Sequence, residues 1–320
     1  MKYFQLTAAL LIVFVTLYDN AGAEPMVSGR TANQEFADTK VAMLVNAVCS
    51  GDHVAISAAL QSGVDVEARG RLGETPLFWA VKCENLYGIE SLLKAKANPN
   101  YRIPGQFTAV WAASEMYNPA PLKLLLRYGG DPNTDDGEDS ARTALWNALV
   151  VGTSGHGWDN YYALLEAGAD ISRSTTAGET IVTEAIALGA FDRAEELLNR
   201  GYKGDLLDLS GSVSGRKTDD TAAPHIVAAK ARIVKYLEEK KIPVPPVPGS
   251  VAGRVWMDSN HVLTVFWRHH REGTIVVKPW KQIIRPEDAS YRNILARVHG
   301  IAPYQSRLIL RDLTSTDGTH

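Results

Sequence analysis

The sequence has no strong excess of charge of one sign, and it contains only two cysteines in 320 residues. It carries 33 Lys and Arg residues against 36 Asp and Glu residues, which leaves a net charge of −3. Proteins that bind nucleic acid usually carry a basic patch, so this balance argues against a nucleic-acid partner. A hydrophobic fraction of 45% and a charged fraction of 22% are typical of a folded globular protein.

Catalytic motifs are also missing from the sequence. Residues 211–215 (Gly-Ser-Val-Ser-Gly) have the wrong spacing for a nucleophile elbow, and there is no Walker loop, dinucleotide-binding glycine pattern or H-E-x-x-H. His261, His269 and His270 lie in a predicted strand region, where adjacent side chains point to opposite faces. We expect these to be surface histidines, and we expect a protein that is not an enzyme and uses no cofactor or metal.

Long apolar runs are absent except near the N-terminus. Lys2 precedes an uninterrupted apolar run at residues 8–15, and Ala21 and Ala23 supply the small residues of a cleavage site. This pattern indicates a secretory signal peptide over residues 1–23, because the run is short for the alternative, a membrane anchor. We expect cleavage after Ala23, a periplasmic location and no membrane span in the mature chain.

The main internal pattern is a repeat with a period of about 33 residues. Residues 73–80 (Gly-Glu-Thr-Pro-Leu-Phe-Trp-Ala) align with residues 106–113, and further copies begin at residues 143 and 178. Each copy continues with a Leu-Leu pair. The pattern resembles the ankyrin repeat, whose signature is T-P-L-H-x-A followed by a Leu-Leu helix. The resemblance covers about residues 40–205 and implies a mainly α fold, an ankyrin-repeat solenoid.

The repeated residues have distinct physical roles. We expect the Thr of each copy to cap the first helix and the Leu-Leu pair to form the core of the second. A glycine then ends the second helix in a left-handed conformation, at Gly63, Gly129, Gly168 and Gly201. The third copy departs from the pattern by an insertion at residues 152–157. Insertions in repeat proteins often lie on the binding face, although neutral drift explains this one equally well.

The segments around the repeats have a different composition. Residues 24–39 are an N-terminal extension, residues 206–243 a degenerate repeat with a capping helix, and residues 244–250 a Pro-rich linker. Within residues 206–243 we expect an irregular finger up to Pro224. Helical spacing of apolar residues then predicts a helix over residues 225–241.

The last segment, residues 251–320, is rich in Val, Ile, Thr and aromatic residues in its first half. It is predicted to form a small α+β domain that follows the ankyrin-repeat solenoid. Asp288 is expected to cap a helix with an apolar face formed by Tyr291, Ile294, Leu295 and Val298. The expected strands cover residues 261–268, 274–278 and 307–312, with a hairpin turn at residues 271–273.

Part of this tail carries a second resemblance. Residues 272–277 (Glu-Gly-Thr-Ile-Val-Val) and residues 291–303 (Tyr-x-x-Ile-Leu-x-x-Val-x-Gly-Ile-x-Pro) resemble the C-terminal segment of bacterial immunity proteins encoded beside type VI secretion lipase effectors. The chain lacks the closing Pro-Trp-Pro of that family and departs from its pattern at Glu272, Arg297, His299 and Tyr304. The resemblance implies binding to a secreted toxin.

The two cysteines are a candidate disulfide. Cys49 and Cys83 fall near the ends of the first helices of successive repeats, and a disulfide is reasonable in an oxidising compartment. Against it, neighbouring repeats lie roughly 10 Å apart, whereas a disulfide needs about 4.4–6.8 Å between Cα atoms. If the disulfide forms, we expect its role to be structural and not redox.

Aromatic and Arg side chains are enriched among binding hot spots, which selects three candidate partner contacts. These are Trp79, Tyr101 and Arg102. Trp111 and Trp146 occupy a signature position of the repeat and are expected in the core.

Charged residues in the finger loops between repeats are further candidates. Arg69 and Arg71 are basic residues of an early finger, whereas a later finger is acidic. The acidic run is a solvated loop on the simpler interpretation, or a patch that steers a basic partner on the other. Its members are Asp135, Asp136, Glu138 and Asp139.

Two functions fit these features. The first is a periplasmic protein-binding module, an immunity protein that sterically blocks a type VI secretion toxin such as a phospholipase. The alternative is a periplasmic ankyrin scaffold or stress-protection protein that supports an enzyme such as a catalase. The partner in either case is another protein, and the first function makes it a cognate secreted effector.

Overall fold

The computed structural model describes residues 25–310, with gaps at residues 106, 138–140, 177, 217, 219–221, 243, 245–250, 259, 268–279 and 298–305. The expected signal peptide therefore lies outside the described residues, as do nearly all of the Pro-rich linker, the expected strand at 274–278 and its turn. The chain is mainly helical. It divides into two compact units, one ending at Ala169 and one running from Asp170 onward, with residues 139–141 grouped with the second.

A short clasp of residues 26–36 opens the first unit. Strands β1 (Met26–Val27) and β2 (Arg30–Thr31) pair antiparallel, and helix α2 (Ala32–Glu35) follows directly. Thr31 and Gln34 form a capping box at the start of α2, which explains a helix of only four residues. Phe36 then inserts into the core beside Val41 and Trp79. The segment expected to be a simple N-terminal extension is thus a packed part of the unit.

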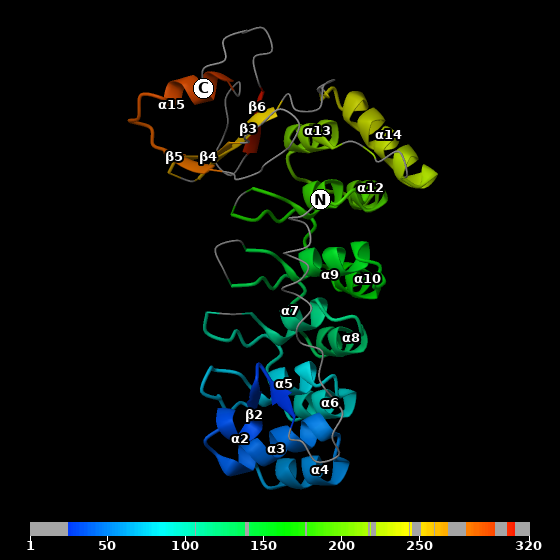
Figure 1. The fold of residues 1–320 in the computed structure, drawn as a ribbon, viewed down its shortest axis with the longest axis vertical. Coiled ribbons are helices and arrows are strands. Elements are labelled where there is room, and N and C mark those ends of the chain that lie inside the picture. The colour runs from blue at the N-terminus through cyan, green and yellow to red at the C-terminus, as the bar shows by residue number, and fades with distance from the viewer. Residues whose placement is uncertain are drawn as a thin grey trace. The chain divides into compact units, whose positions relative to one another are not determined.

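Four helix pairs follow the clasp in the first unit (Figure 1). The first helices of the pairs contact one another in succession, and so do the second helices. Each pair therefore buries its apolar face against its neighbours, as repeat architectures require. The pairs are α3 (Thr39–Ser50) with α4 (His53–Gln61), α5 (Pro76–Lys82) with α6 (Leu86–Lys94), α7 (Ala109–Ser114) with α8 (Ala120–Arg127), and α9 (Ala144–Thr153) with α10 (Asp159–Glu166).

The predicted caps are confirmed at both ends of the helix pairs. The side-chain hydroxyls of Thr75, Thr108 and Thr143 each accept a hydrogen bond from the backbone three residues later, which satisfies a donor at the helix start. The expected glycines after the second helices are left-handed, with φ of 78–93° at Gly63, Gly129, Gly168 and Gly201. In the second pair this position is held by Lys96, with φ of 73°.

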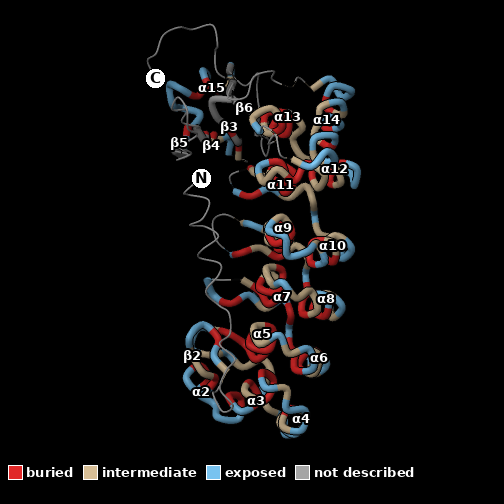
Figure 2. Tube along the Cα trace, turned by 45° about the vertical axis from the view of Figure 1, so that its right-hand side comes forward, coloured by how far each residue is buried: buried red, intermediate tan, exposed pale blue. Residues whose placement is uncertain are grey.

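Burial follows the repeat pattern. Buried residues run along the inner sides of the helices, while exposed ones dominate their outer sides and the connecting segments (Figure 2). The Leu-Leu pairs lie in the core, as expected: Leu92 and Leu125 are fully buried. Trp146 is also buried, whereas Trp111 is only half-buried.

The second unit begins with two further helix pairs, α11 (Ile181–Ala187) with α12 (Phe191–Asn199), and α13 (Leu206–Gly215) with α14 (Pro224–Glu239). The helix expected over residues 225–241 is confirmed as α14. The irregular finger expected before Pro224 is wrong for residues 206–215, which form α13. Leu209 and Val213, one turn apart, are fully buried, so packing outweighs the low helix propensity of the Gly and Ser residues.

A four-stranded antiparallel sheet follows, in the order β5-β4-β3-β6. Val255, Met257, Leu263, Val265 and Ile284 form one apolar cluster with Tyr291 and Ile294 of the helix. The strands expected at residues 261–268 and 307–312 correspond to β4 and β6 within the described residues, whereas β3 and β5 were not expected. The elements are β3 (Val251–Met257), β4 (Leu263–Trp267), β5 (Trp280–Ile284), β6 (Ser306–Leu310) and α15 (Tyr291–Arg297).

Two features are absent from the described ranges. No helix there is both long and apolar enough to cross a membrane. The same residues contain no cluster of three or more His, Cys, Asp and Glu side chains placed to hold a metal ion.

Candidate protein-binding surface

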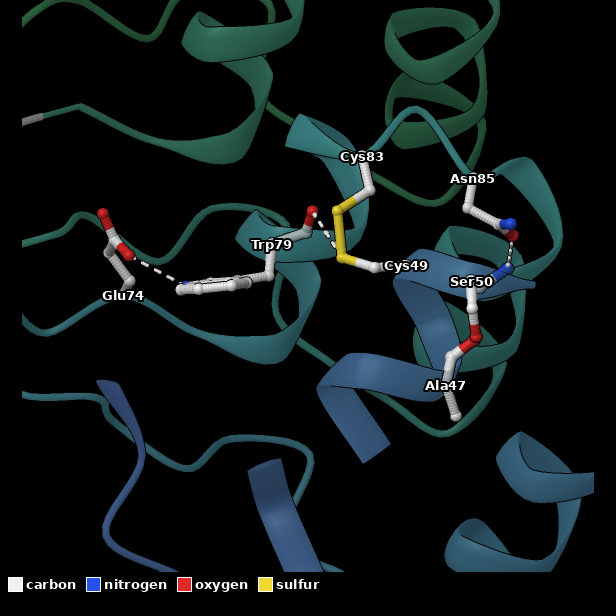
Figure 3. The surroundings of a disulfide bond; sticks show 8 residues. Ala47, Cys49, Ser50, Glu74, Trp79, Cys83 and Asn85 are labelled. Carbon is white, nitrogen blue, oxygen red and sulfur yellow. Dashed lines mark hydrogen bonds between the residues drawn. A yellow bond between two sulfur atoms is a disulfide. The ribbon is translucent and has the colours of Figure 1, made fainter. Parts of the chain in front are cut away.

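Cys49 and Cys83 form a disulfide that ties the first two helix pairs together (Figure 3). The bond joins the end of α3 to the C-cap of α5, where the Cα atoms are 5.2 Å apart. This separation lies within the usual range for disulfides and is well below the general spacing of repeats, because the two helix ends converge. The Cys49 sulfur also lies 3.8 Å from the carbonyl oxygen of Trp79. A disulfide sulfur carries no hydrogen, so this is a packing contact.

Trp79 belongs to the core, which corrects its expected role as a partner contact. Its side chain is fully buried, and its indole Nε1 donates a 2.8 Å hydrogen bond to Glu74 Oε2. Its ring meets Phe36 edge-on, with the ring centroids 5.9 Å apart. This position varies in the repeat pattern, and its side chain would be exposed to solvent in a repeat without the clasp. In this protein Phe36 of the clasp covers it.

Two buried carboxylates sit beside Trp79. Glu35 and Glu74 are almost fully buried, and Arg30 reaches both: Nε lies 3.0 Å from Glu35 Oε2, and Nη2 lies 3.9 Å from Glu74 Oε1. Burial raises the pKa of Glu74, and the nearby charge of Glu35 raises it further, against the lowering effects of the Trp79 hydrogen bond and Arg30. Glu35 Oε1 also accepts a hydrogen bond from the backbone N–H of Leu72 at 2.7 Å. The network fastens the clasp to the loop that precedes α5.

The finger loops of the first unit extend from one side of the helix pairs (Figure 1). We call the described parts of residues 64–75, 97–108 and 130–143 the finger row. Hydrogen bonds connect neighbouring fingers: Asn98 N donates to Glu67 Oε1 at 2.6 Å, and Asp131 N donates to Asn100 Oδ1 at 2.7 Å. These bonds fix the fingers relative to one another before any partner binds.

Tyr101 and Arg69 form one exposed contact of the finger row. The Arg69 guanidinium carbon lies 3.6 Å from the centroid of the Tyr101 ring, and Arg69 Nη2 pairs with Glu67 Oε2 at 3.0 Å. The cation therefore sits over the ring face, where the π electrons attract it. The structure brings these two predicted residues together, with Arg69 exposed and Tyr101 half-buried.

Arg102 and the acidic finger are joined directly. Arg102 Nη2 lies 2.8 Å from Asp135 Oδ1, and Nη1 donates to the Asp135 carbonyl at 3.1 Å. Asp136 is buried, with 7% of its surface exposed. Glu138 and Asp139 lie outside the described residues. The acidic run is therefore not one open patch, because the described aspartates are either paired with Arg102 or buried.

Arg71 and three apolar residues complete the surface. Arg71 and Leu72 are exposed at the tip of the first finger, and Leu72 exposes 43% of its surface. Phe107 stacks on Trp111 with centroids 4.4 Å apart, and both rings are half-buried. Sequence reasoning missed Leu72 and Phe107. Leu72 could have been predicted, because it is an apolar residue that lies between Arg71 and Gly73 in a finger tip.

Comparison with known proteins identifies one repeat within the first unit. The ankyrin repeat family model matches residues 72–103, which cover the first finger tip, α5, α6 and the start of the next finger. The chain is also 27% identical over 150 residues to glycerophosphocholine phosphodiesterase gde1 from Schizosaccharomyces pombe. That match covers 46% of this chain and only 13% of the yeast protein. The chain thus carries an ankyrin repeat, and this repeat points to a protein–protein interaction module.

Proposed function

We propose that the chain is an exported immunity protein that binds a type VI secretion toxin and sterically blocks its active site. The finger row is the proposed binding surface, a phospholipase is the proposed partner, and the chain itself performs no chemistry. The ankyrin repeat supports a protein partner. The N-terminal pattern supports export to the periplasm after cleavage at Ala23, and the resemblance of the tail supports the immunity role.

The proposal extends to the architecture that presents this surface. We infer that the helix pairs of the first unit form an ankyrin solenoid and that residues 251–320 form a small α+β domain. The shared apolar cluster of the sheet and α15 supports the second point. An ankyrin scaffold alone would not need this domain, so its presence favours the immunity proposal over the scaffold alternative.

One observation carries the binding role: exposed Arg71 and Leu72 stand beside the Arg69–Tyr101 pair on a rigid frame. Arg and Tyr side chains supply much of the energy at protein interfaces, and an exposed Leu adds apolar area. Hydrogen bonds between fingers, the disulfide and the clasp hold the frame in place. A preordered surface loses less conformational entropy on binding, which favours tight inhibition.

Co-purification tests the proposal. The full chain is expressed with its N-terminal segment, recovered from the periplasm and analysed for bound proteins. We expect a lipase-type toxin whose phospholipid hydrolysis is inhibited by the added chain. Recovery of a housekeeping enzyme such as a catalase, protected from inactivation and with no toxin present, would instead establish the scaffold function.

A matched pair of variants locates the surface. Leu72→Asp should weaken toxin binding by about a hundredfold, as expected for a residue within a binding hot spot. Val227→Asp is the control, because Val227 exposes 45% of its surface against 43% for Leu72 but lies in the second unit. Equal effects of the two substitutions would show that the finger row is not the binding surface.

A further inference from the structure

The turns that join the two helices of each pair form a second row in the first unit. We call residues 51–54, 84–87, 115–119 and 154–159 the helix-turn edge. Adjacent turns touch: the rings of His53 and Tyr87 stack with centroids 3.5 Å apart, and Asn118 Nδ2 donates to Glu84 Oε2 at 3.0 Å. The rings of Tyr117 and His156 stack with centroids 3.6 Å apart. The four turns therefore make one continuous surface.

The helix-turn edge exposes an unusual share of apolar side chains. Among the described residues of the first unit, four of the seven large apolar side chains that are exposed belong to it. Tyr117 exposes 60% of its surface and Val54 exposes 81%, with Leu86 and Tyr87 also exposed. Clustered exposed apolar residues rimmed by polar groups mark interaction sites more often than scattered ones do.

The charged side chains that the four turns themselves carry are all acidic, apart from the two histidines. The turns contain the carboxylates Asp52, Glu84, Glu115 and Asp159 and no Lys or Arg. Lys82 pairs with Glu115 at 3.5 Å, and Lys123 pairs with Asp159 at 2.9 Å, both from helices beside the turns. Two of the four carboxylates are therefore already matched by a lysine, whereas Glu84 shares the edge with the exposed rings of Tyr87 and Tyr117. A carboxylate beside Tyr rings suits a cationic side chain, because both groups attract a guanidinium or ammonium ion.

Glu84 occupies a backbone position that favours glycine. Its φ is 55°, in the left-handed region, whereas Gly51, one period earlier, has a φ of 75°. The corresponding turn after α9 uses Gly155, with a φ of 87°. Glycine adopts this conformation without steric cost, and a glutamate does not. A carboxylate kept in a strained position points to a role other than stability.

The insertion in the third copy completes the helix-turn edge. Helix α9 has 10 residues against seven in α5, and the turn beyond it carries His156 onto the ring of Tyr117. The extra residues therefore place an exposed ring at the same edge as the His53–Tyr87 stack. The insertion therefore extends the helix-turn edge by one stacked ring, that of His156.

We propose that the helix-turn edge is a second interaction surface, which binds a Lys- and Arg-rich segment of a partner protein. The cationic side chains contact the Tyr87 and Tyr117 rings and the carboxylate of Glu84, while aliphatic parts of the segment cover Val54 and Leu86. This surface is separate from the finger row, so a partner can occupy it while a toxin is bound.

A peptide-binding experiment on the full mature chain tests the proposal. The probe is a fluorescein-labelled peptide of about five Arg-Ala-Leu triplets, and an equal peptide with Glu in place of Arg is the charge control. Fluorescence anisotropy measures both at about 50 mM and about 300 mM salt. We expect binding of the Arg peptide that weakens with salt and no binding of the Glu peptide. Equal binding of the two peptides would overturn the proposal.

Three variants distinguish this edge from other acidic surfaces. The double substitution Tyr87→Ala with Tyr117→Ala should weaken Arg-peptide binding by about tenfold, because two stacking rings are lost. Glu84→Gly should also weaken binding without lowering Tm, since glycine relieves the left-handed backbone. Glu239→Ala removes an exposed carboxylate of α14, outside the helix-turn edge, and should leave peptide binding unchanged.

The outcomes separate this proposal from the proposed function. Unchanged peptide binding in both edge variants would reject the helix-turn edge, whatever the toxin assay shows. Loss of toxin inhibition by Leu72→Asp, with normal peptide binding, would support the finger row independently. Concentration-dependent dimers that disappear in Tyr87→Ala with Tyr117→Ala would assign the edge to a second copy of this chain and overturn the proposed partner.

Discussion

Nε1 of Trp79 donates a 2.8 Å hydrogen bond to Oε2 of Glu74, five residues earlier in the chain. The bond lies inside the core, where Glu74 also faces Glu35 and shares Arg30 with it. One arginine thus serves two buried carboxylates, and Ser28 Oγ lies 3.4 Å from Glu74 as a further donor. The stability of the N-terminal clasp is therefore tied to the protonation of Glu74.

Glu74→Gln should stabilise the protein at neutral pH. The pKa of Glu74 is raised above 4.5, chiefly by burial, so the folded state binds its proton more tightly than the unfolded state does. The contribution of Glu74 to the free energy of unfolding is therefore largest below pH 4.5, and it is lost as the pH rises through the raised pKa. Glutamine removes that loss and keeps an oxygen acceptor for Trp79. Urea unfolding from pH 4.5 to 8 should show a variant advantage that grows with pH; a variant less stable than the native chain at neutral pH would contradict this.

Replacing both cysteines should lower the free energy of unfolding of the first unit. The disulfide closes a loop between residues 34 apart in sequence, which corresponds to about 2–4 kcal/mol. Cys49→Ala with Cys83→Ala can be compared with the native chain by urea denaturation under non-reducing conditions. Adding a reductant to the native chain should reproduce the loss, and a change below about 0.5 kcal/mol would argue against a stabilising bond.

Lys96→Gly should stabilise the second helix pair. Lys96 has a φ of 73° at the position where Gly63, Gly129 and Gly168 end the second helices of the other pairs. Its side chain is exposed, so the substitution relieves backbone strain of about 1 kcal/mol and removes no buried contact. A rise in Tm checks the prediction. Gly129→Lys is the reverse control and should lower Tm by a similar amount.

The Arg102–Asp135 pair should contribute little to stability. Arg102 is 40% exposed, and pairs of this kind give about 0.2–1 kcal/mol in double-mutant cycles. Arg102→Ala, Asp135→Ala and the double variant supply such a cycle, measured by denaturant unfolding. A coupling energy above about 2 kcal/mol would mean that this ion pair holds the fingers together.

Local sequence signals predicted the helix pairs well. Thr75, Thr108 and Thr143 cap the helices because capping depends on neighbours three residues away. The left-handed glycines follow from backbone sterics alone. Helix α13 was missed because its stability comes from burying Leu209 and Val213, which the Gly and Ser residues around them obscure.

The candidate surface was less predictable, because it depends on contacts distant in sequence. Trp79 looks like an open position of a repeat until Phe36, 43 residues earlier, covers it. Likewise, the acidic finger looks exposed until Arg102, 33 residues before Asp135, pairs with it. Neither contact has a local signature. The separation of the Cys49 and Cys83 Cα atoms likewise depends on how two helix ends converge.

The disulfide between the first two helix pairs makes the two ends of the first unit unequal in stability. The main helix contacts of the first unit join pairs that are neighbours in sequence, so structure is gained or lost progressively along the unit. The N-terminal end of the first unit carries both the clasp and the disulfide, so these two features hold that end most firmly. In an oxidising compartment, formation of the disulfide would let the first two helix pairs fold before the rest of the first unit. The finger nearest the disulfide would then be the first one able to bind a partner.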